Sequence, residues 1–319
     1  MIRQSARAVV TRRLCCVQPG WMNSVFDIVP FAQKAYRRKL WLQSEANYLN
    51  IAKDKDYPQW LYSVGEALFP MKLHNEEMQK DLTYFIAAQC GDDEQGIALA
   101  KACTPDYPPL CKRIVIDNEW FKTLRRDDVT LVTDPILGIE PDALVTEHGD
   151  RCNVDVIVYA TGFKSNEFLQ PMEITGADGR TLQDTWGREP RAYLGVVAPP
   201  SFPNMYFFYG PNTNSGHHSI IAHAECQVNY VLGCCKAMIA RGISVLDVKP
   251  QVFDDYIVEV NERMGEIVWE TGGCDSWYIQ DGKVVNNSPW AVSEMAWMLR
   301  KPMLEDFVID GDNGGVTPT

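Results

Sequence analysis

Several features that would place a protein in a class at once are missing from this 319-residue sequence. No apolar run reaches the roughly 18 residues that a membrane-spanning helix needs, and no secretory signal with a small-residue cleavage site is recognisable. The sequence has no C-x-x-C pair, which excludes a zinc half-site or thioredoxin-like motif of that spacing. It also lacks the G-x-S-x-G turn of many serine hydrolases. We therefore expect a soluble intracellular chain without a membrane span, whose ten cysteines are reduced thiols.

Positive charge is scarce overall but concentrated at the start. Thirty Lys and Arg residues against 42 Asp and Glu give a net charge of −12, so we expect no nucleic-acid partner. Residues 1–41 nevertheless carry a net charge of +7, with Asp27 as their single acid. Such a start is typical of a mitochondrial transit peptide, and the alternative is a damaged domain start after Thr11. The cytoplasm is the predicted compartment, and the mitochondrion is the alternative that this start leaves open.

The pattern of apolar residues changes along the chain. Residues 31–102 show near-helical spacing, which predicts two or three helices separated at Pro58, at Pro70 and within 90–96. After Pro105, short apolar runs predict buried strands over 129–132, 143–146, 154–159 and 205–209. A longer helix is predicted from Ile220. The order indicates an α/β protein, and the length suggests about two domains.

Two segments before residue 165 suit ligand binding. A proline-stiffened loop over 104–111 delivers Lys112 and Arg113, and such cations bind phosphate or stabilise a developing anion. The alternative is a solvated basic pair. The apolar run 155–159 opens into Ala160-Thr161-Gly162, where glycine lets backbone amides approach a ligand closely. A plain turn after a strand is the alternative there.

Two further segments follow. Residues 202–219 combine an aromatic run with a polar loop, Gly210-Pro211-Asn212 and onward, that opens a helix. Residues 271–278 form a glycine-rich turn with an aromatic pair that includes Trp277, for which a place in the core is the alternative to ligand contact. No metal site is predicted, because the spacing of His218, His223 and Cys226 does not place them on one helical face.

The order and spacing of these segments are more specific than any one of them. The patterns are Y-P-x-x-C-K-R, D-x-I-x-x-A-T-G-F, F-P-N followed by G-P-N-T-N-x-G-H-x-S-I, and G-G-C-x-S-W-Y. Together they resemble the C-terminal half of FAD- and NADPH-dependent Baeyer-Villiger monooxygenases, within the class B flavin-containing monooxygenase group. The resemblance covers residues 19–309 and is densest over 104–278.

The resemblance implies a set of roles. Arg113 matches the catalytic arginine that stabilises an anionic peroxyflavin, and Lys112 matches the lysine that contacts the 2′-phosphate of NADP. The remaining matches are cofactor-binding: Ala160, Thr161 and Gly162 close against the FAD domain, Gly210, Pro211 and Asn212 lie near the flavin ring, and Trp277 reaches NADP. The implied reaction uses NADPH and O2 to insert oxygen beside a ketone or to oxidise a soft heteroatom.

The departures from the family pattern are equally specific. The two G-x-G-x-x-G loops for FAD and NADPH and the H-x-x-x-W fingerprint are absent from the sequence. Val17 and Gln18 stand where the family has Arg and Ser or Thr, and Leu110 replaces the glycine before C-K-R. The resemblance therefore implies an N-terminally truncated flavoprotein fold. The alternative is a non-catalytic fragment or an interaction partner of a full-length relative.

The implied fold is an incomplete α/β flavoprotein with two dinucleotide-binding domains. Residues 1–150 would be the distal part of the NADP domain, with a helical insertion at about 31–102. Residues 151–319 would be the distal part of the FAD domain and the C-terminal loop region. Unpaired sheet edges in such a fold favour association with another chain.

Overall fold

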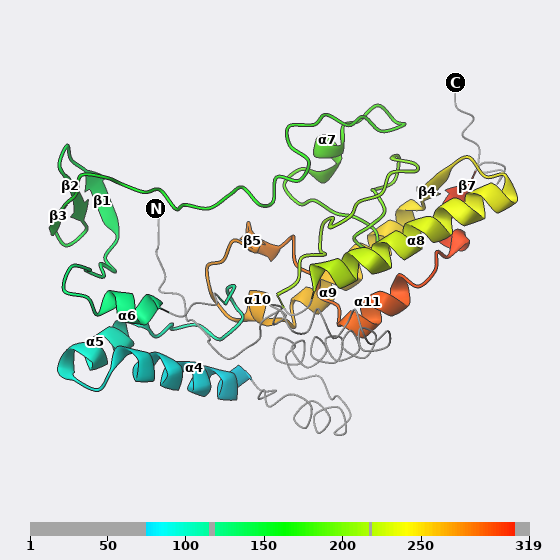
Figure 1. Ribbon diagram of the computed structural model, residues 1–319. Helices are drawn as coiled ribbons and strands as arrows, with labels where there is room; N and C mark the ends of the chain where they lie inside the picture. The colour runs from blue at the N-terminus through cyan, green and yellow to red at the C-terminus, as the bar shows by residue number, and fades with distance from the viewer. Residues whose placement is uncertain (1–74, 115–118, 217–218, 310–319) are drawn as a thin grey trace, which may run out of the picture. The chain divides into compact units, whose positions relative to one another are not determined.

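The computed structural model describes residues 75–114, 119–216 and 219–309 (Figure 1). They fall into two compact units. The first contains Asn75–Pro109 and Arg113–Lys164, and the second contains Leu110–Lys112 and the chain from Ser165 onward. Three sequence-based expectations lie outside the described residues. They are the helix breaks at Pro58 and Pro70, the positively charged residues 1–41, and the replacement of the family's Arg and Ser or Thr by Val17 and Gln18.

Three helices open the first unit: α4 (Asn75–Cys90), α5 (Glu94–Cys103) and α6 (Trp120–Leu124). The predicted helix break within 90–96 is confirmed between α4 and α5. Asp93 starts α5 because its carboxylate accepts the Gly96 N–H at 2.7 Å. The helix ends just before Pro105, which disfavours helical geometry in the residue that precedes it. The three helices bury a common core of Ile86, Cys90, Cys103, Phe121 and Leu124.

Asp93 also makes the start of α5 sensitive to pH. Arg125 Nη2 donates to Asp93 Oδ2 at 2.6 Å, and the same guanidinium donates to the Cys90 carbonyl. The hydrogen bond from Arg125, followed by that from Gly96, lowers the pKa of Asp93 below its ordinary 3.8. A carboxylate with a lowered folded pKa contributes stability above its unfolded pKa, and that contribution is lost as pH falls through the folded value.

We expect Asp93→Asn to be less stable than the wild type at pH 7, with a difference that shrinks below the ordinary Asp pKa of 3.8. Denaturant unfolding of both proteins between pH 7 and pH 2.5 measures this difference. Asp127→Asn, at an exposed position of the same unit, is the control. A difference of the same size across the whole range would contradict the expectation.

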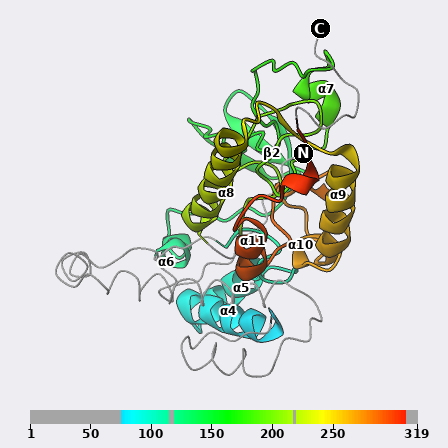
Figure 2. The same ribbon diagram turned by 90° about the vertical axis from the view of Figure 1, so that its right-hand side faces the viewer.

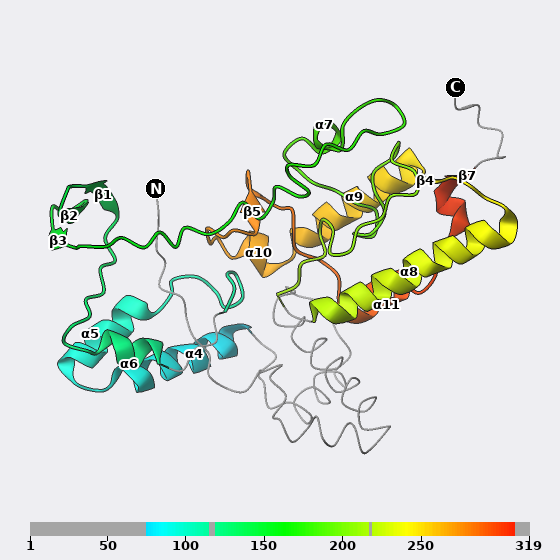
Figure 3. The same ribbon diagram turned by 45° about the horizontal axis from the view of Figure 1, so that its top comes forward.

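A small antiparallel sheet follows α6 in the first unit (Figure 3). It contains β1 (Ile136–Ile139), β2 (Ala143–Thr146) and β3 (Arg151–Asn153) in sequence order. The predicted strand over 143–146 is confirmed as β2. The predicted strand over 129–132 is wrong, because Val129 and Leu131 pack against the helical core instead of joining a ladder.

The predicted buried strand over 154–159 is also wrong. The last strand before it, β3, ends at Asn153, and Val156 and Val158 are 76% and 83% exposed. An extended run becomes a strand when neighbours supply partners for its backbone groups, and no ladder among the described residues includes this run. The turn at 160–162 therefore follows irregular chain.

Two long helices dominate the second unit and appear as separate columns in Figure 2. The predicted helix from Ile220 is confirmed as α8 (Ile220–Arg241), which Ser219 caps and which Gly242 ends at φ +67°. The second is α9 (Pro250–Met264), where proline occupies the first turn and loses no helical hydrogen bond. None of the described helices is long and apolar enough to cross a membrane.

Short elements complete the second unit. Its short helices are α7 (Leu182–Trp186), α10 (Val268–Thr271), α11 (Val292–Met298) and the 3₁₀ helix η1 (Leu304–Asp306). Two antiparallel pairs join β4 (Leu246–Val248) to β7 (Phe307–Ile309) and β5 (Ile279–Gln280) to β6 (Lys283–Val284). The main core packs α8, α9 and α11 around residues such as Tyr230, Tyr256, Val260, Trp290 and Met295.

The predicted strand over 205–209 is wrong in this unit. The run makes a single bridge, from Tyr206 to Val197. Asn204 and Tyr209 flank it with φ of +59° and +60°, and left-handed residues end an extended ladder. The aromatic run therefore becomes a bend that buries Phe207 and leads into the Gly210 loop.

Candidate functional site

The loop that carries Lys112 is fastened to the second unit by two different bonds. Cys111, which is fully buried, forms a disulfide with Cys274. Next to it, Trp269 Nε1 donates a hydrogen bond to the Leu110 carbonyl at 3.1 Å. Within the second unit, the structure thus joins residues 110–112 of one predicted ligand segment to the predicted turn 271–278, far away in the sequence.

The prediction that all ten cysteines are reduced is wrong for this pair. Cys111 and Cys274 are 163 residues apart, and no local spacing signals such a contact. The other described cysteines are free. Burial raises the pKa of Cys103 and of Cys234 to about 11, which keeps these thiols protonated and unreactive.

Leu110 occupies a backbone conformation that suits glycine. Its φ is +67°, a left-handed value that costs a residue with a side chain about 1 kcal/mol. This is the position where the family resemblance expects glycine. The chain therefore holds the loop before Cys111 and Lys112 in a strained conformation, which the disulfide and the Trp269 hydrogen bond help to maintain.

We expect Leu110→Gly to raise the free energy of unfolding by about 0.5–1 kcal/mol, because glycine adopts positive φ without strain. Thermal or denaturant unfolding measures this change. Ala98→Gly is the control: Ala98 is exposed within α5, where glycine should cost about 1 kcal/mol. A loss of stability in Leu110→Gly as large as that in the control would contradict the strain at Leu110.

Trp269, which the sequence did not single out, connects three of the motif segments. This α10 residue is 1% exposed. Its indole donates to Leu110, its ring lies against Gly216, and it makes an edge contact with Tyr278 at 5.8 Å between ring centroids. The C-K-R loop, the G-P-N-T-N-S-G loop and the G-G-C-D-S-W-Y turn therefore share one buried indole.

Trp277 is the exposed member of the aromatic pair. It is 43% exposed, whereas its neighbour Tyr278 is buried. Their ring centroids are 4.6 Å apart, so the buried ring supports the exposed one. The indole is therefore partly exposed on a turn that the Cys274 disulfide anchors.

The Gly210-Pro211-Asn212 loop is buried and closely packed. A Cβ at Gly210 would lie 2.7 Å from the Gly195 carbonyl, so this close approach excludes any side chain there. Thr213 Oγ1 donates back to the Gly210 carbonyl at 2.6 Å. Asn212 has φ +54°, a conformation that asparagine tolerates better than most residues.

Two asparagines that the sequence analysis missed hold this loop in place. Asn212 Nδ2 donates to the Asn287 carbonyl at 3.3 Å, and Asn214 Nδ2 donates to Asn287 Oδ1. Asn286 accepts the Asn214 N–H through its carbonyl. The available sequence signal was the doublet Asn286-Asn287 directly after the apolar Val284-Val285, since polar side chains that become buried need hydrogen-bond partners.

The same doublet retains unused hydrogen-bonding capacity. Asn286 Oδ1 and Asn287 Nδ2 are buried and have no partner among the described residues. Leaving such a group unpaired costs about 1–3 kcal/mol. One is an acceptor and the other a donor, so together they suit a ligand with a complementary polar edge.

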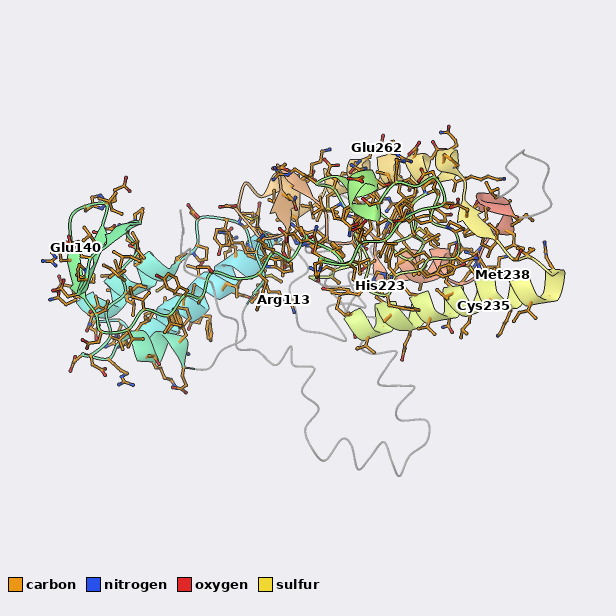
Figure 4. All side chains as sticks on the ribbon, turned by 90° about the horizontal axis from the view of Figure 1, so that it is seen from above. Arg113, Glu140, His223, Cys235, Met238 and Glu262 are labelled. Atoms are coloured by element: carbon orange, nitrogen blue, oxygen red, sulfur yellow. A yellow bond between two sulfur atoms is a disulfide. The ribbon has the colours of Figure 1, made fainter. Side chains whose placement is uncertain are left out.

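The remaining predicted residues belong to the first unit. Arg113 is exposed on the stretch between α5 and α6 (Figure 4). Ala160, Thr161 and Gly162 are exposed on irregular chain, and Gly162 has φ +89°. The second unit therefore brings together Lys112, the Gly210 loop and the Trp277 turn through Trp269, and it does not contain Arg113 or residues 160–162.

The described histidines and acidic residues form no metal centre. No group of three His, Cys, Asp or Glu side chains among the described residues is placed to hold a metal ion. His218 lies outside that part of the chain, and His223 is buried on α8 (Figure 4).

Solved structures of monooxygenases share this fold. Oxidised steroid monooxygenase bound to NADP superposes with a TM-score of 0.69 at 23% identity, covering 96% of this chain and 60% of that one. Cyclohexanone-bound cyclohexanone monooxygenase superposes with a TM-score of 0.63 at 18% identity, covering 92% of this chain and 58% of the other. The mixed α/β structure therefore matches part of a two-dinucleotide-domain monooxygenase.

Sequence relatives specify the family. An uncharacterised monooxygenase of Mycobacterium tuberculosis is 33% identical over 246 residues, which are 77% of this chain and 49% of the relative. A Baeyer-Villiger monooxygenase of Pseudomonas aeruginosa is 35% identical over 192 residues, 60% of this chain and 36% of the relative. No model of a known protein family matches the chain. Over the part that it shares with these relatives, the chain belongs to the class B flavin monooxygenases of the Baeyer-Villiger family, and it spans less than half of either relative's length.

Proposed function

We propose that this chain supplies the NADP-contacting and flavin-facing loops of a Baeyer-Villiger-type monooxygenase, which uses NADPH and O2 to oxidise a ketone or a soft heteroatom. The observation that carries the proposal is the Cys111–Cys274 bond. It places Lys112, one residue after Cys111, and Trp277, three residues after Cys274, on two linked segments. These are the two residues to which the family resemblance gives the same ligand, NADP.

The chain's own residues fit the NADP side of such a site. The ammonium of Lys112 suits a phosphate, and the exposed indole of Trp277 suits contact with a planar ring. On the flavin side, the closely packed Gly210–Asn212 loop would line the site. The unpaired Asn286 Oδ1 and Asn287 Nδ2 atoms would supply the flavin with an acceptor and a donor. NADPH would supply hydride to the flavin when both are bound.

The described residues do not fit the pyrophosphate of FAD. No described strand runs into a helix through a glycine-rich turn, and that turn places a pyrophosphate at a helix N-terminus in dinucleotide-binding folds. We propose that this part of the site comes from polypeptide other than the described residues. The proposed domain division, with distal NADP-domain residues up to 150 and distal FAD-domain residues from 151, is consistent with that need.

Arg113 is the proposed catalytic residue, and Ala160, Thr161 and Gly162 are the proposed contacts to the FAD domain. A guanidinium stays charged at all physiological pH values. A fixed cation stabilises negative charge that develops beside it, and the effect is largest where water is excluded. The exposed position of Arg113 in its own unit leaves it accessible to a bound reactant.

The test has two steps. The purified chain is incubated with FAD, desalted and examined by visible absorption, and we expect no retained flavin. A chimera that adds the region of the Pseudomonas aeruginosa relative outside the match is expected to retain flavin and to form product from a ketone with NADPH. Flavin retained by the chain alone would overturn the proposed external pyrophosphate site.

The role of Arg113 is tested in the same chimera. Arg113→Ala is expected to keep flavin and NADPH oxidation but to lose ketone product. Arg126→Ala is the control, because Arg126 is an exposed arginine of the same unit that pairs with Asp128. Product formation by Arg113→Ala at the parent rate would refute the catalytic role.

A second candidate function is non-catalytic association with a full-length relative. Large apolar side chains on the irregular run are exposed, namely Val156, Val158, Tyr159 and Phe163. Contiguous exposed apolar residues are typical of an interaction surface. Co-purification of the chain with a full-length relative tests this candidate, and loss of binding in Val158→Lys would locate the contact.

A further inference from the structure

The segment Leu110–Lys112 belongs to the second unit, whereas the residues on either side of it in the sequence belong to the first. The two bonds that fasten it differ in chemistry. A hydrogen bond from Trp269 to Leu110 is insensitive to oxidants and reductants, whereas the Cys111–Cys274 disulfide forms only under oxidising conditions. The number of bonds that attach Leu110–Lys112 to the rest of the second unit therefore depends on the redox state.

We propose that Cys111 and Cys274 form a reversible thiol–disulfide clamp, which sets how firmly Lys112 is held beside the turn that carries Trp277. The clamp itself follows from the bond and its position. Its effect on a phosphate-bearing dinucleotide rests on the proposed function of Lys112. The oxidised form would present the ammonium of Lys112 in a fixed position, and preorganisation of this kind favours binding.

The position of the pair within the chain supports a regulatory role. Cys111 directly precedes Lys112 and Cys274 lies three residues before Trp277, the two residues with proposed NADP contacts, whereas Cys90, Cys103 and Cys234 are free thiols buried in helix cores. On the side of Cys274, Gly272 and Gly273 precede the cysteine. Gly273 has φ +65° and open space where a Cβ would lie, so this side of the clamp has room to move when the bond opens.

The chemistry of the switch balances by thiol–disulfide exchange. A small disulfide such as oxidised glutathione accepts two electrons and leaves as two thiols, while the Cys111 and Cys274 thiols lose two protons and form one S–S bond. A dithiol reductant reverses the reaction. Because both sulfurs are buried in the oxidised form, the loop has to open locally before exchange, and we expect slow reduction.

The test compares oxidised and reduced forms of the whole chain. Samples equilibrated with oxidised glutathione or with a phosphine reductant are analysed by non-reducing peptide mapping and by hydrogen exchange with mass spectrometry. We expect the linked Cys111–Cys274 peptide in the first sample and its return after reoxidation of the second. Amides of 110–113 and 272–278 should exchange about tenfold more slowly in the oxidised form.

Variants separate the clamp from general destabilisation. The double variant Cys111→Ser/Cys274→Ser should exchange like the reduced wild type under both conditions, whereas Cys235→Ser, at an exposed free cysteine of the same unit, should follow the wild type. Trp269→Phe keeps the ring but removes the donor to Leu110. It should speed exchange at 110–113 more in the reduced form than in the oxidised form, because the disulfide then remains as a second anchor.

Three outcomes are decisive. A linked peptide that does not re-form, or exchange that is equal in both redox states, would overturn the clamp. Redox-dependent exchange together with NADP⁺ protection of 110–113 that is stronger in the oxidised form would support both the clamp and the role of Lys112. The NADP⁺ arm is run in the chimera that supplies the missing region, where redox-dependent exchange without any NADP⁺ protection of 110–113 would support the clamp and overturn the proposed contact of Lys112.

Discussion

Loss of the Cys111–Cys274 disulfide is expected to lower the free energy of unfolding of the second unit by about 2–5 kcal/mol. The bond closes a segment of 163 residues, and closing a long segment removes much conformational freedom from the unfolded chain. For this length the loop-closure relation gives about 5 kcal/mol at 25 °C, an upper value because unfolded chains keep some structure.

Denaturant unfolding of the wild type and of Cys111→Ser/Cys274→Ser, with and without reductant, measures this effect. Reductant should destabilise the wild type and leave the double variant unchanged. Cys235→Ser, at an exposed free thiol, should stay within about 0.5 kcal/mol of the wild type. Equal stability of the oxidised and reduced wild type would show that the bond contributes nothing to folding.

Trp269→Ala is expected to cost about 3–5 kcal/mol, because it removes a large buried side chain and leaves a cavity. The indole is 1% exposed and touches three segments. Trp269→Phe should cost less, since it keeps most of the packing and loses the hydrogen bond to Leu110, worth about 1 kcal/mol.

Trp297→Ala is the matched control for this prediction. Trp297 is 66% exposed and lies under the Arg300 guanidinium at 3.6 Å from the ring centroid, a contact worth about 0.5–1 kcal/mol at an exposed site. Denaturant midpoints of the three variants give the comparison. If Trp269→Ala and Trp297→Ala lose the same stability, Trp269 does not connect the motif segments as described.

The disulfide and Trp269 together change how the motifs are interpreted. As separate stretches of sequence, each motif also has a non-functional interpretation. The C-K-R loop could be a solvated basic pair, and the G-G-C-D-S-W-Y turn could be an aromatic pair of the core. The bond and the shared indole show that both stretches belong to one local structure. That structure also contacts the closely packed loop before α8, at Gly216.

The sequence by itself determined the features that depend on neighbouring residues or on fixed motif spacing. The helices α4, α5 and α8 follow from apolar spacing and from the break within 90–96, and the structure adds the caps Asp93 and Ser219 and the terminal Gly242. The family was also identifiable from the order of four motifs, none of which is specific alone. These signals are local or linear, so no knowledge of long-range contacts was needed.

Only the tertiary structure decided the features that depend on distant partners. Residues 154–159 have a strand-like composition, but without a neighbouring strand in the described chain they stay irregular. Cys103 is near Cys111 in the sequence but stays free, and the fold instead brings Cys111 to the distant Cys274. Asn287 and Trp269 act through contacts with segments up to 159 residues away. Strand pairing, disulfide pairing and buried hydrogen bonds each need a partner group. The tertiary fold determines which distant residue supplies that partner.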